Sequence, residues 1–489
     1  MTDLSADIIN RNFSYQGRAE IRFGPDTLKR KDNMRKQNAL KWIEEQKEYV
    51  DRRVNYGIEQ YRKSTAMLAF FDKNGKPLNN ISFKARLKKH EFDFGCNLFL
   101  LDEFETEEKN ILYRKLFSQV FNYATLPFYW KDIEPQKGKL RFKKESPGIY
   151  RRPAPDLCVE FCKENNIKMK GHCLAYEGFA PDWVSNEKGT YIKELTKRFS
   201  EISKRYSGII EDWDVTNETF NWHPSYCVTP LYRDPDYMKI CYGLADEFFR
   251  HNKKIVNENF GIWYPSGSGG FSYCNSPFYL QLENMILKGI DFDACGFQIH
   301  QFVSKDGEKD YAKNRYNPKY VYDVLDTFAR LGKTIQLSEV TIASYTHEEE
   351  DMEIQAEIAK EMYKIWFSHP AVTSIIYWNM ADGYTYNPNG SGVCDMSCGE
   401  NVYAGGLLKP DLSPKPVYNT LKKLIKEEWN TCGEFCTAKD SNYASFRGFK
   451  GTYELEINFN GKCQKKEFYL TDTDFDDFAC DSTVKIMLD

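Results

Sequence analysis

The sequence predicts a (β/α)8 barrel of the α/β class, with an N-terminal accessory region of helix and strands and a small C-terminal β-module. From Phe92 onward, short apolar strands alternate with longer helical stretches, which is typical of a parallel sheet covered by helices. Eight such strands within about 330 residues fit a closed barrel better than an open sheet. No glycine-rich phosphate loop follows any of these strands, which disfavours a nucleotide-binding fold.

The expected elements divide the chain into an accessory region at 1–88, a barrel at 89–430 and a β-module at 431–489. Barrel strands are expected at 92–98, 123–130, 167–176, 209–217, 254–258, 294–301, 334–341 and 374–380. Apolar residues at helical spacing predict a long helix over 33–64, followed by strands at 66–71 and 81–87. After a helix near 417–428, an Asn-Gly turn at 460–461 predicts a β-hairpin of strands 452–459 and 463–470.

Composition narrows the possible partners. The 67 basic and 71 acidic residues give a formal net charge of −4 and form no single basic stripe, so a nucleic-acid partner is not expected. The aromatic content of 15% suits stacking on sugar rings as well as an ordinary core. No apolar run is long enough to span a membrane, and residues 1–20 contain nothing like the apolar part of a signal peptide. We expect a monomer that is cytoplasmic as written, or extracellular if a signal has been removed.

The cysteines leave two interpretations open. Several of the fourteen fall inside expected strands, where a reduced thiol behaves as a small apolar side chain. Two C-x3-C pairs, Cys394 with Cys398 and Cys432 with Cys436, could hold a metal or form disulfides, or they could be unpaired thiols in loops. Their spacing matches no common zinc motif, and neither a metal nor an organic cofactor is expected.

Polar residues gather where the expected barrel strands end. The carboxyl ends of barrel strands converge on one face, and a carboxylate there is costly to desolvate unless it has a partner or a function. Strands four and seven lie on opposite sides of such a barrel, so Glu218 and Glu339 can face each other across its mouth. The polar ends include His172 to Glu177, Trp213 to Glu218, Asn257-Glu258, Gln298 to Gln301, Ser338-Glu339 and Trp378-Asn379, with Asp382 just beyond.

Two facing glutamates suit the cleavage of a glycosidic bond. One protonated carboxyl donates to the leaving oxygen while an ionised carboxylate lies opposite, and a separation of about 5 to 5.5 Å gives retention of configuration whereas a wider gap gives inversion. Asn217, directly before Glu218, is placed to bond the 2-hydroxyl of a sugar. The alternative is that both glutamates form salt bridges with Lys or Arg inside the barrel.

Five strand ends together resemble a known family. The motifs are Gly171-His172 followed by Pro181-Asp182-Trp183, then Trp213-Asp214-Val215-Thr216-Asn217-Glu218, Gln298-Ile299-His300, Ser338-Glu339, and Trp378 with Asp382. In this order and spacing they resemble the family ten glycoside hydrolases, the endo-β-1,4-xylanases, as does the segment 414–418 before the last helix. The resemblance covers about residues 85–430 and implies the barrel fold.

The resemblance also implies roles for individual residues. It makes Glu218 the acid/base, Glu339 the nucleophile, and His300 the residue that keeps the nucleophile ionised. The residues expected to line the substrate site are His172, Tyr176, Asn217, Gln298, His300 and Trp378. The histidines could instead be core residues bonded to backbone, and Trp378 could be barrel packing.

Several positions depart from the family pattern. Its strand-two motif has a Glu-Asn pair and a Lys that grip the next sugar on the non-reducing side, whereas residues 122–130 here are shorter and apolar. Its Trp-His after strand three is replaced by Tyr176-Glu177, its Asp two residues after the nucleophile by Thr341, and its strand-eight loop Trp by Tyr386. Glu177 would raise the pKa of a neighbouring carboxyl if the two are close.

These observations predict a retaining hydrolase of xylan or xylo-oligosaccharides that uses no cofactor. Loss of polar grips should weaken discrimination between sugars, so another β-linked glycan, such as a mixed-linkage β-glucan or an aryl glycoside, is the first alternative. A carbohydrate-binding barrel that has lost catalysis is the second. The terminal regions are glycan-binding modules or packing for the ends of the barrel.

Overall fold

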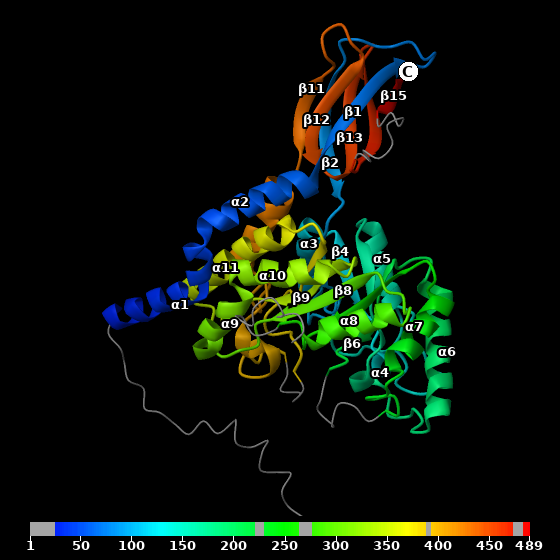
Figure 1. Cartoon of the computed structure of the whole chain (residues 1–489), viewed down its shortest axis with the longest axis vertical. Coiled ribbons are helices and arrows are strands. Elements are labelled where there is room, and N and C mark those ends of the chain that lie inside the picture. Colours follow the sequence, from blue (N-terminus) through cyan, green and yellow to red (C-terminus); the bar gives the residue numbers. More distant parts are fainter. Residues whose placement is uncertain (1–24, 221–228, 264–275, 388–392, 473–482) are drawn as a thin grey trace, which may run out of the picture.

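The predicted (β/α)8 barrel is confirmed. A computed structural model describes residues 25–220, 229–263, 276–387, 393–472 and 483–489, and side chains from residue 34 onward; the segment to which the signal-peptide expectation refers lies outside this part (Figure 1). Eight parallel strands close in the order β10-β3-β4-β5-β6-β7-β8-β9. They are β3 (Asp93–Asn97), β4 (Tyr123–Pro127), β5 (Lys168–Ala175), β6 (Asp212–Asn217), β7 (Lys253–Glu258), β8 (Ala294–His300), β9 (Thr334–Thr341) and β10 (Val372–Tyr377).

Helices alternate with these strands and cover the outside of the barrel (Figure 1). Proline begins several of them, as at α5, α8 and α10, because the first helical position needs no backbone N–H donor. They are α3 (Glu107–Val120), α4 (Trp130–Ile133), α5 (Pro155–Glu164), α6 (Lys188–Tyr206), α7 (Tyr237–Phe248), α8 (Pro277–Leu287), α9 (Glu308–Arg315), α10 (Pro318–Ala329), α11 (Glu349–Ser368) and α12 (Pro416–Lys423).

Close packing fixes β5 against β6. A Cβ atom at Gly171 would lie 2.1 Å from the ring of Trp213, which is fully buried, so only glycine leaves room for this ring. The resulting register pairs His172 with Asp214.

The long helix expected over 33–64 is broken in two. The structure has α1 (Pro25–Glu45) and α2 (Lys47–Gly57), followed by a π-helical turn (Ile58–Arg62). At the break, the Gln46 side chain donates to Asn317 Oδ1 at 2.9 Å, a contact with the barrel that helical periodicity does not reveal.

The N-terminal strands and the C-terminal strands form one β-module, which corrects the expected division into separate regions at 1–88 and 431–489. One sheet has the order β12-β1-β15 and the other β11-β2-β13-β14. Phe70 of β1 meets Phe83 of β2 with ring centroids 5.2 Å apart, so the two sheets share a core. The strands are β1 (Lys63–Asp72), β2 (Ser82–His90), β11 (Cys432–Cys436), β12 (Tyr443–Phe449), β13 (Gly451–Phe459), β14 (Lys462–Leu470) and β15 (Val484–Leu488). The pair β13 and β14 is the predicted hairpin.

The β-module joins the barrel at the amino ends of its strands. Strand β2 ends at His90 and β3 begins at Asp93, so the chain passes directly from one unit into the other (Figure 1). Trp429 stacks on Phe367 at 4.2 Å and on Phe94 at 5.5 Å, closing this end with aromatic rings. The carboxyl ends of the strands, where the site is expected, therefore lie at the opposite end from the module.

The two cysteine pairs lie far apart and cannot form one site. Cys432 and Cys436 lie on β11, in the module, whereas Cys394 and Cys398 follow β10 at the other end of the barrel. Four residues along a strand span roughly 13 Å, so Cys432 and Cys436 cannot bond to each other. None of the four forms a disulfide, and the described residues contain no group of three side chains suited to a metal ion.

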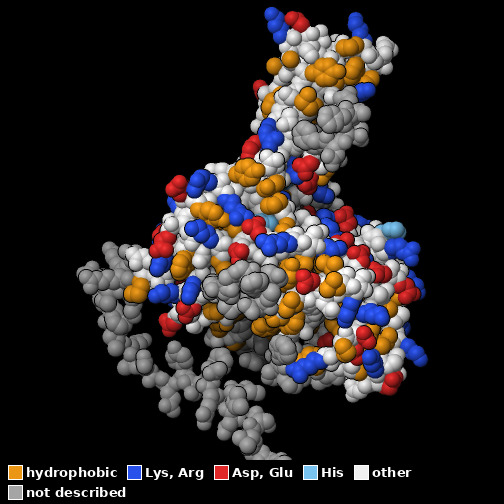
Figure 2. All heavy atoms as spheres, in the orientation of Figure 1, with side chains coloured by type: hydrophobic (Ala, Val, Ile, Leu, Met, Phe, Trp, Pro, Cys, Tyr) orange, Lys and Arg blue, Asp and Glu red, His pale blue; other side chains and the backbone are white. Residues whose placement is uncertain are grey.

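Basic and acidic side chains alternate over the face shown in Figure 2, as the balanced composition indicates. Within the described ranges, no helix is both long and apolar enough to cross a bilayer.

Candidate active site

Strand register brings the expected site residues together at the carboxyl ends of the barrel strands. Residues that face each other across neighbouring strands lie within side-chain contact, so each such pair can share a hydrogen bond. The pairs are His172 with Asp214, Asn217 with Asn257, Gln298 with Glu339, and His300 with Thr341.

Glu339, on β9, is held by side chains from three other strands. Asn257 Nδ2 donates to Glu339 Oε1 at 2.8 Å, and His300 Nε2 lies 3.1 Å from Oε2. His172 Nε2 lies 3.9 Å from Oε1. The residue is only 3% exposed, so the carboxyl group has a fixed position and little contact with water.

Burial raises the pKa of Glu339 from 4.5 to about 7. Positive charge from His172 and Lys170 and the hydrogen bond from Asn257 act in the opposite direction and favour the ionised form. Lys170 is fully buried, and its Nζ lies 3.0 Å from Asp214 Oδ2, which is also 2.7 Å from His172 Nδ1. Lys170, Asp214 and His172 thus form a row of polar contacts that leads from the barrel interior to this carboxylate.

His300 meets Glu339 as a neutral ring. Burial lowers the pKa of His300 to about 4, so the imidazole carries no charge near neutral pH. Its Nδ1 lies 2.9 Å from Thr341 Oγ1, the residue that replaces the Asp of the family pattern. With Glu339 ionised, Nε2–H donates to the carboxylate and Nδ1 accepts from the threonine hydroxyl. His300 therefore supplies a hydrogen bond but no charge to Glu339, whereas Lys170 supplies positive charge near this carboxylate.

Glu218 follows the last residue of β6 and has an unusual backbone conformation. Its φ is +50°, in the left-handed region that side-chain-bearing residues seldom adopt. The Tyr176 hydroxyl donates to Glu218 Oε2 at 2.5 Å. Burial is the main cause that raises the pKa of Glu218, and the negative charge of Glu339 raises it further. These effects keep the carboxyl group protonated to higher pH than an exposed glutamate.

Asn217 is oriented by two amides. Its Oδ1 accepts from Asn257 Nδ2 at 2.8 Å and from Gln298 Nε2 at 3.1 Å. Because the oxygen is occupied, the Nδ2 donors of Asn217 are the groups that remain for a sugar hydroxyl. Asn257 thus contacts both Asn217 and Glu339.

Five aromatic residues form a wall beside the glutamates, here called the aromatic wall: Phe99, Tyr129, Tyr176, Phe179 and Trp378. Trp378 lies 5.2 Å from Phe99 and 5.7 Å from the ring of His172, between centroids. Both Trp378 and Tyr176, expected to line the site from sequence, belong to this wall.

Tyr129 and Arg152 occupy the region after β4, where the family pattern has its polar grip. The Arg152 guanidinium lies 4.1 Å from the ring centroid of Tyr129, and its Nε donates to Asp132 Oδ2 at 2.7 Å. In this region the structure therefore holds a cation over an aromatic face.

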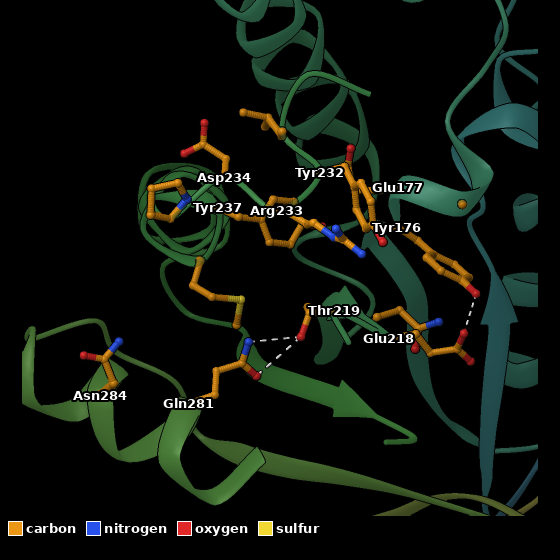
Figure 3. A pocket seen from close by; sticks show the side chains of 15 residues that line it. Tyr176, Glu177, Glu218, Thr219, Tyr232, Arg233, Asp234, Tyr237, Gln281 and Asn284 are labelled. Atoms are coloured by element: carbon orange, nitrogen blue, oxygen red, sulfur yellow. Dashed lines mark hydrogen bonds between the residues drawn. The ribbon is translucent and has the colours of Figure 1, made fainter. Parts of the chain in front are cut away.

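A cavity of about 200 Å³ opens beside Glu218 (Figure 3). Figure 3 shows the Tyr176 hydroxyl directed at Glu218, and the Gln281 side chain of α8 meeting Thr219. Asn217 also lines it, together with Tyr237 and Met238 of α7 and Asn284 of α8.

Glu177 also lines this cavity. Burial raises the pKa of Glu177 to about 7, and the Tyr191 hydroxyl bonds its carboxyl group at 3.1 and 3.2 Å. The largest causes that raise the pKa of Glu218 are burial and Glu339. The carboxylate that raises the pKa of Glu218 is therefore Glu339, and not Glu177 as the sequence suggested.

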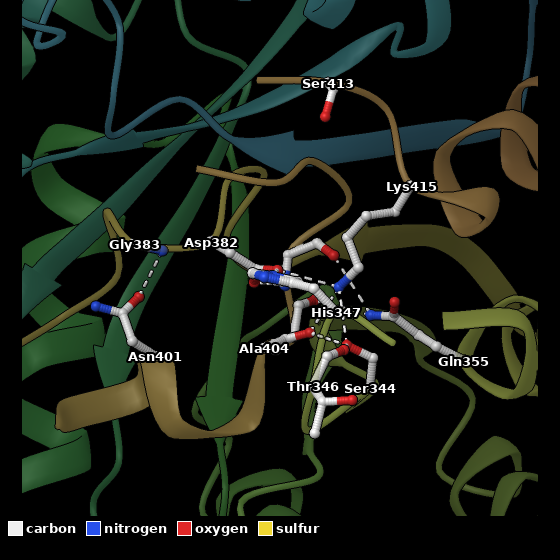
Figure 4. A network of polar contacts seen from close by, with 12 residues as sticks. Ser344, Thr346, His347, Gln355, Asp382, Gly383, Asn401, Ala404, Ser413 and Lys415 are labelled. Carbon is white, nitrogen blue, oxygen red and sulfur yellow. Dashed lines mark hydrogen bonds and ion pairs between the residues drawn. The ribbon is translucent and has the colours of Figure 1, made fainter. Parts of the chain in front are cut away.

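Asp382 anchors the loops that follow β9 and β10 (Figure 4). Its Oδ2 lies 2.8 Å from His347 Nε2 and 3.1 Å from Lys415 Nζ, while Oδ1 accepts from the Gly406 N–H at 2.6 Å. Lys415 also donates to the Ala404 carbonyl at 2.7 Å. The resemblance pointed to Asp382, and the structure gives it a role in holding loops.

Sequence reasoning noticed but did not assign four polar residues at strand ends. Asn257, Glu258, Asp214 and Thr341 stood in the motifs, and their contacts with the site depend on register. Lys170 was missed entirely, although a lysine inside an apolar strand is a signal that could have found it.

A closed (β/α)8 barrel with two buried glutamates at the carboxyl ends of its strands is the arrangement of a glycoside hydrolase. The chain belongs to glycosyl hydrolase family 10, whose profile matches residues 86–424.

Curated relatives are about a quarter identical to the chain over the aligned residues. The anti-sigma-I factor RsgI6 of Acetivibrio thermocellus is 23% identical over 428 residues, which are 87% of this chain and 48% of that protein. The chain therefore spans about half the length of this relative, and the alignment extends beyond the family profile. Endo-1,4-beta-xylanase B of Thermotoga neapolitana is 23% identical over 313 residues, covering 61% of this chain and 78% of the relative.

Solved structures share the barrel fold. Xylanase 10B from Thermotoga maritima matches with a TM-score of 0.53 and 21% identity, covering 69% of this chain and 96% of the other. Xylanase 10B from Thermotoga petrophila in complex with xylobiose matches with a TM-score of 0.53 and 23% identity, covering 69% and 95%. At these identities the likeness concerns the fold alone.

Proposed function

We propose that the chain is a retaining glycoside hydrolase that cleaves internal β-1,4 bonds of xylan or xylo-oligosaccharides, with Glu339 as nucleophile and Glu218 as acid/base. The observation that carries the proposal is the unlike surroundings of the two buried glutamates. Burial raises the pKa of Glu339 to about 7, while positive charge from His172 and Lys170 and a hydrogen bond from Asn257 oppose this rise, so that Glu339 is ionised above neutral pH. Glu218 faces the negative charge of Glu339, which favours the protonated acid.

Two displacements follow from these protonation states. Ionised Glu339 attacks the anomeric carbon while Glu218 transfers its proton to the leaving glycosidic oxygen, so an ester between the sugar and Glu339 forms as the glycosidic bond breaks. Ionised Glu218 then takes a proton from water, whose oxygen attacks the anomeric carbon and releases Glu339. Two inversions at one carbon give net retention.

The remaining site residues hold the sugar. Asn217 donates from Nδ2 to the 2-hydroxyl, a bond that strengthens as positive charge develops at the ring. Trp378 and the partly exposed members of the aromatic wall, Tyr176 and Phe179, stack on sugar faces. Xylan is favoured among β-linked glycans because relatives such as the Thermotoga neapolitana protein are named endo-1,4-beta-xylanases.

The test compares the chain with Glu339→Ala and Glu218→Gln on xylan, mixed-linkage β-glucan and xylo-oligosaccharides. We expect xylan to be cut into products of several lengths, with the β-anomer released first in proton NMR, and both variants to lose at least about 1,000-fold in rate. Glu434→Ala, on the outer face of the module, is the control that keeps full activity.

Three results would contradict the proposal. Full activity in either glutamate variant would remove the assigned pair. The α-anomer as first product would mean inversion. Tight binding of oligosaccharides without any released reducing ends would identify a binding barrel, and cleavage of β-glucan alone would correct the substrate.

A further inference from the structure

Glu258 is a buried carboxyl group that the proposed chemistry does not use. It is the last residue of β7 and has no exposed surface. Its Oε2 accepts from the backbone N–H of Thr219 at 2.7 Å, from the Thr219 hydroxyl at 2.9 Å and from the N–H of Phe220 at 3.4 Å. Its Oε1 accepts from the N–H groups of Asn259 and Phe260 at 2.9 and 3.2 Å. One side chain therefore joins the loop after β6 to the loop after β7.

The loop that Glu258 holds begins at Glu218. The N–H of Glu218 donates to the Asn257 carbonyl at 3.1 Å, and the next N–H, that of Thr219, donates to Glu258. The peptide groups on both sides of the Glu218 Cα are thus fixed by the last two residues of β7. Between them, Glu218 has its left-handed φ of +50°, a conformation that persists only where the surroundings enforce it.

We propose that Glu258 is a positioning residue, which fixes the Glu218 backbone so that the Glu218 carboxyl group can donate its proton to the leaving oxygen. This inference rests on the proposed function of Glu218. Glu258 acts through hydrogen bonds to Thr219 and Phe220 and touches no substrate.

The five hydrogen bonds that Glu258 accepts from the two loops, here called the clamp, require a carboxylate at this position. All five groups that face Glu258 are donors, and only a carboxylate presents two oxygens that both accept. Glutamine would direct an NH2 group at backbone N–H donors on one side and leave them without an acceptor. Glu258→Gln therefore keeps the volume of the side chain and breaks one half of the clamp.

The clamp also reaches the cavity beside Glu218. Gln281 Nε2 donates to the Thr219 hydroxyl at 3.0 Å, and Gln281 lines the cavity from α8 (Figure 3). Thr219 is therefore held from β7 on one side and from α8 on the other, next to the space that lies beside the proton donor.

The test uses two substrates that differ in their need for a proton donor. The leaving group of xylotetraose is a sugar oxygen that must be protonated as the bond breaks. The leaving group of a 2,4-dinitrophenyl β-xylobioside is a phenolate that is stable without a proton. The value kcat/KM reports the first chemical step for both. We expect Glu258→Gln to lower kcat/KM for xylotetraose by at least about tenfold and for the aryl substrate by less than about threefold. Glu218→Ala is the reference, with the same pattern and a larger loss.

Two further variants separate positioning from folding. Thr219→Val removes one donor to Glu258 and should show the same selectivity for the leaving group, at a smaller size. Asp93→Asn removes a buried carboxylate, paired with Lys168 at 3.1 Å, at the amino end of the barrel. Asp93→Asn should leave the ratio of the two kcat/KM values unchanged, because this carboxyl group lies at the end of the barrel away from Glu218.

Equal losses on both substrates in Glu258→Gln and Thr219→Val, or no loss in folded Glu258→Gln, would overturn the role of Glu258. Absence of leaving-group selectivity in Glu218→Ala itself would instead overturn the proposed acid/base, and the inference with it. If Glu258→Gln does not fold, the role of Glu258 is decided by Thr219→Val alone, from the ratio of its kcat/KM values for the two substrates.

Discussion

The two ends of the barrel use buried charge in different ways. At the amino end, the Arg62 guanidinium donates to the backbone carbonyls of Phe367 at 2.5 Å, Val372 at 2.7 Å and His369. At the carboxyl end, Glu218 and Glu339 have a hydroxyl, an amide and a neutral imidazole as their nearest partners, and burial raises the pKa of both. The charge of Arg62 at the module end is permanent and holds the fold, whereas the charges of Glu218 and Glu339 at the site end change with pH.

The histidines show the same contrast. Burial lowers the pKa of His90, at the module end, to about 3, and the pKa of His300, at the site, to about 4, so both rings are neutral. His90 packs among Phe94, Phe367 and Phe449, while His300 bonds the carboxyl group of Glu339. Burial is common to both ends, and the partners decide whether the group serves packing or chemistry.

The largest expected effect comes from Glu339→Gln. Activity on xylan should fall by at least about 10,000-fold because the nucleophile is lost. Stability should rise, since the folded pKa of about 7 lies above the ordinary value of 4.5 and the ionised group therefore destabilises the fold. This destabilisation is absent below pH 4.5 and complete above pH 7. Above pH 7, Glu339→Gln should therefore raise the free energy of unfolding by up to about 3 kcal/mol. Urea unfolding at pH 5 and pH 8.5 measures it, and an equal change at both pH values would contradict the shift.

Arg62→Leu tests the other end. Loss of charged hydrogen bonds to three carbonyls should lower the free energy of unfolding by about 3 kcal/mol, with kcat/KM on xylan unchanged in the folded protein. Thermal unfolding and initial rates at 25 °C check both parts. A fall in kcat/KM without a change in stability would break the contrast between the two ends.

Lys170→Met should move the acidic limb of the pH profile. Without this positive charge, less opposes the effect of burial on Glu339, so the limb of kcat/KM should shift to higher pH by roughly one unit. Lys170→Arg keeps the charge and should keep the limb. Lys168→Met, at the start of the same strand and paired with Asp93, is the matched control. A limb that moves equally in all three variants would rule out the effect of Lys170.

The smallest effect is expected from Thr341→Val. The change keeps the shape of the side chain and removes the hydroxyl that lies 2.9 Å from His300 Nδ1. The imidazole then loses one of its two contacts, and kcat/KM should fall by less than about tenfold. Initial rates on xylotetraose measure this loss, and a fall as large as that of Glu339→Gln would mean that Thr341 itself takes part in the chemistry.

The barrel and the glutamate pair could be predicted because their signals are local. Apolar strands alternate with helical stretches, and both Glu218 and Glu339 stand directly at strand ends. The β-module could not be predicted as one unit, since β1 pairs with β12, more than 370 residues later in the chain. Strand propensity says nothing about a partner so far away in sequence.

The contacts inside the site could also not be predicted from local sequence patterns. Asn257 and Glu258 stood out as polar residues after an apolar strand, but their partners follow from the register of β6, β7 and β9. Lys170 was hidden because its partner Asp214 lies on the next strand. A buried charge can be assigned a role only when its neighbours are known.

The central claim is that Glu339 is the nucleophile of a retaining hydrolase, and trapping tests it most directly. A 2-deoxy-2-fluoro xylobioside with a dinitrophenolate leaving group should form an ester that hydrolyses slowly, because fluorine destabilises the positively charged transition state of both steps. Mass spectrometry of the intact chain and of its peptides should find one fluoroxylobiosyl group, attached to Glu339. A label on any other residue, or no label from a preparation that cleaves xylan, would contradict the account.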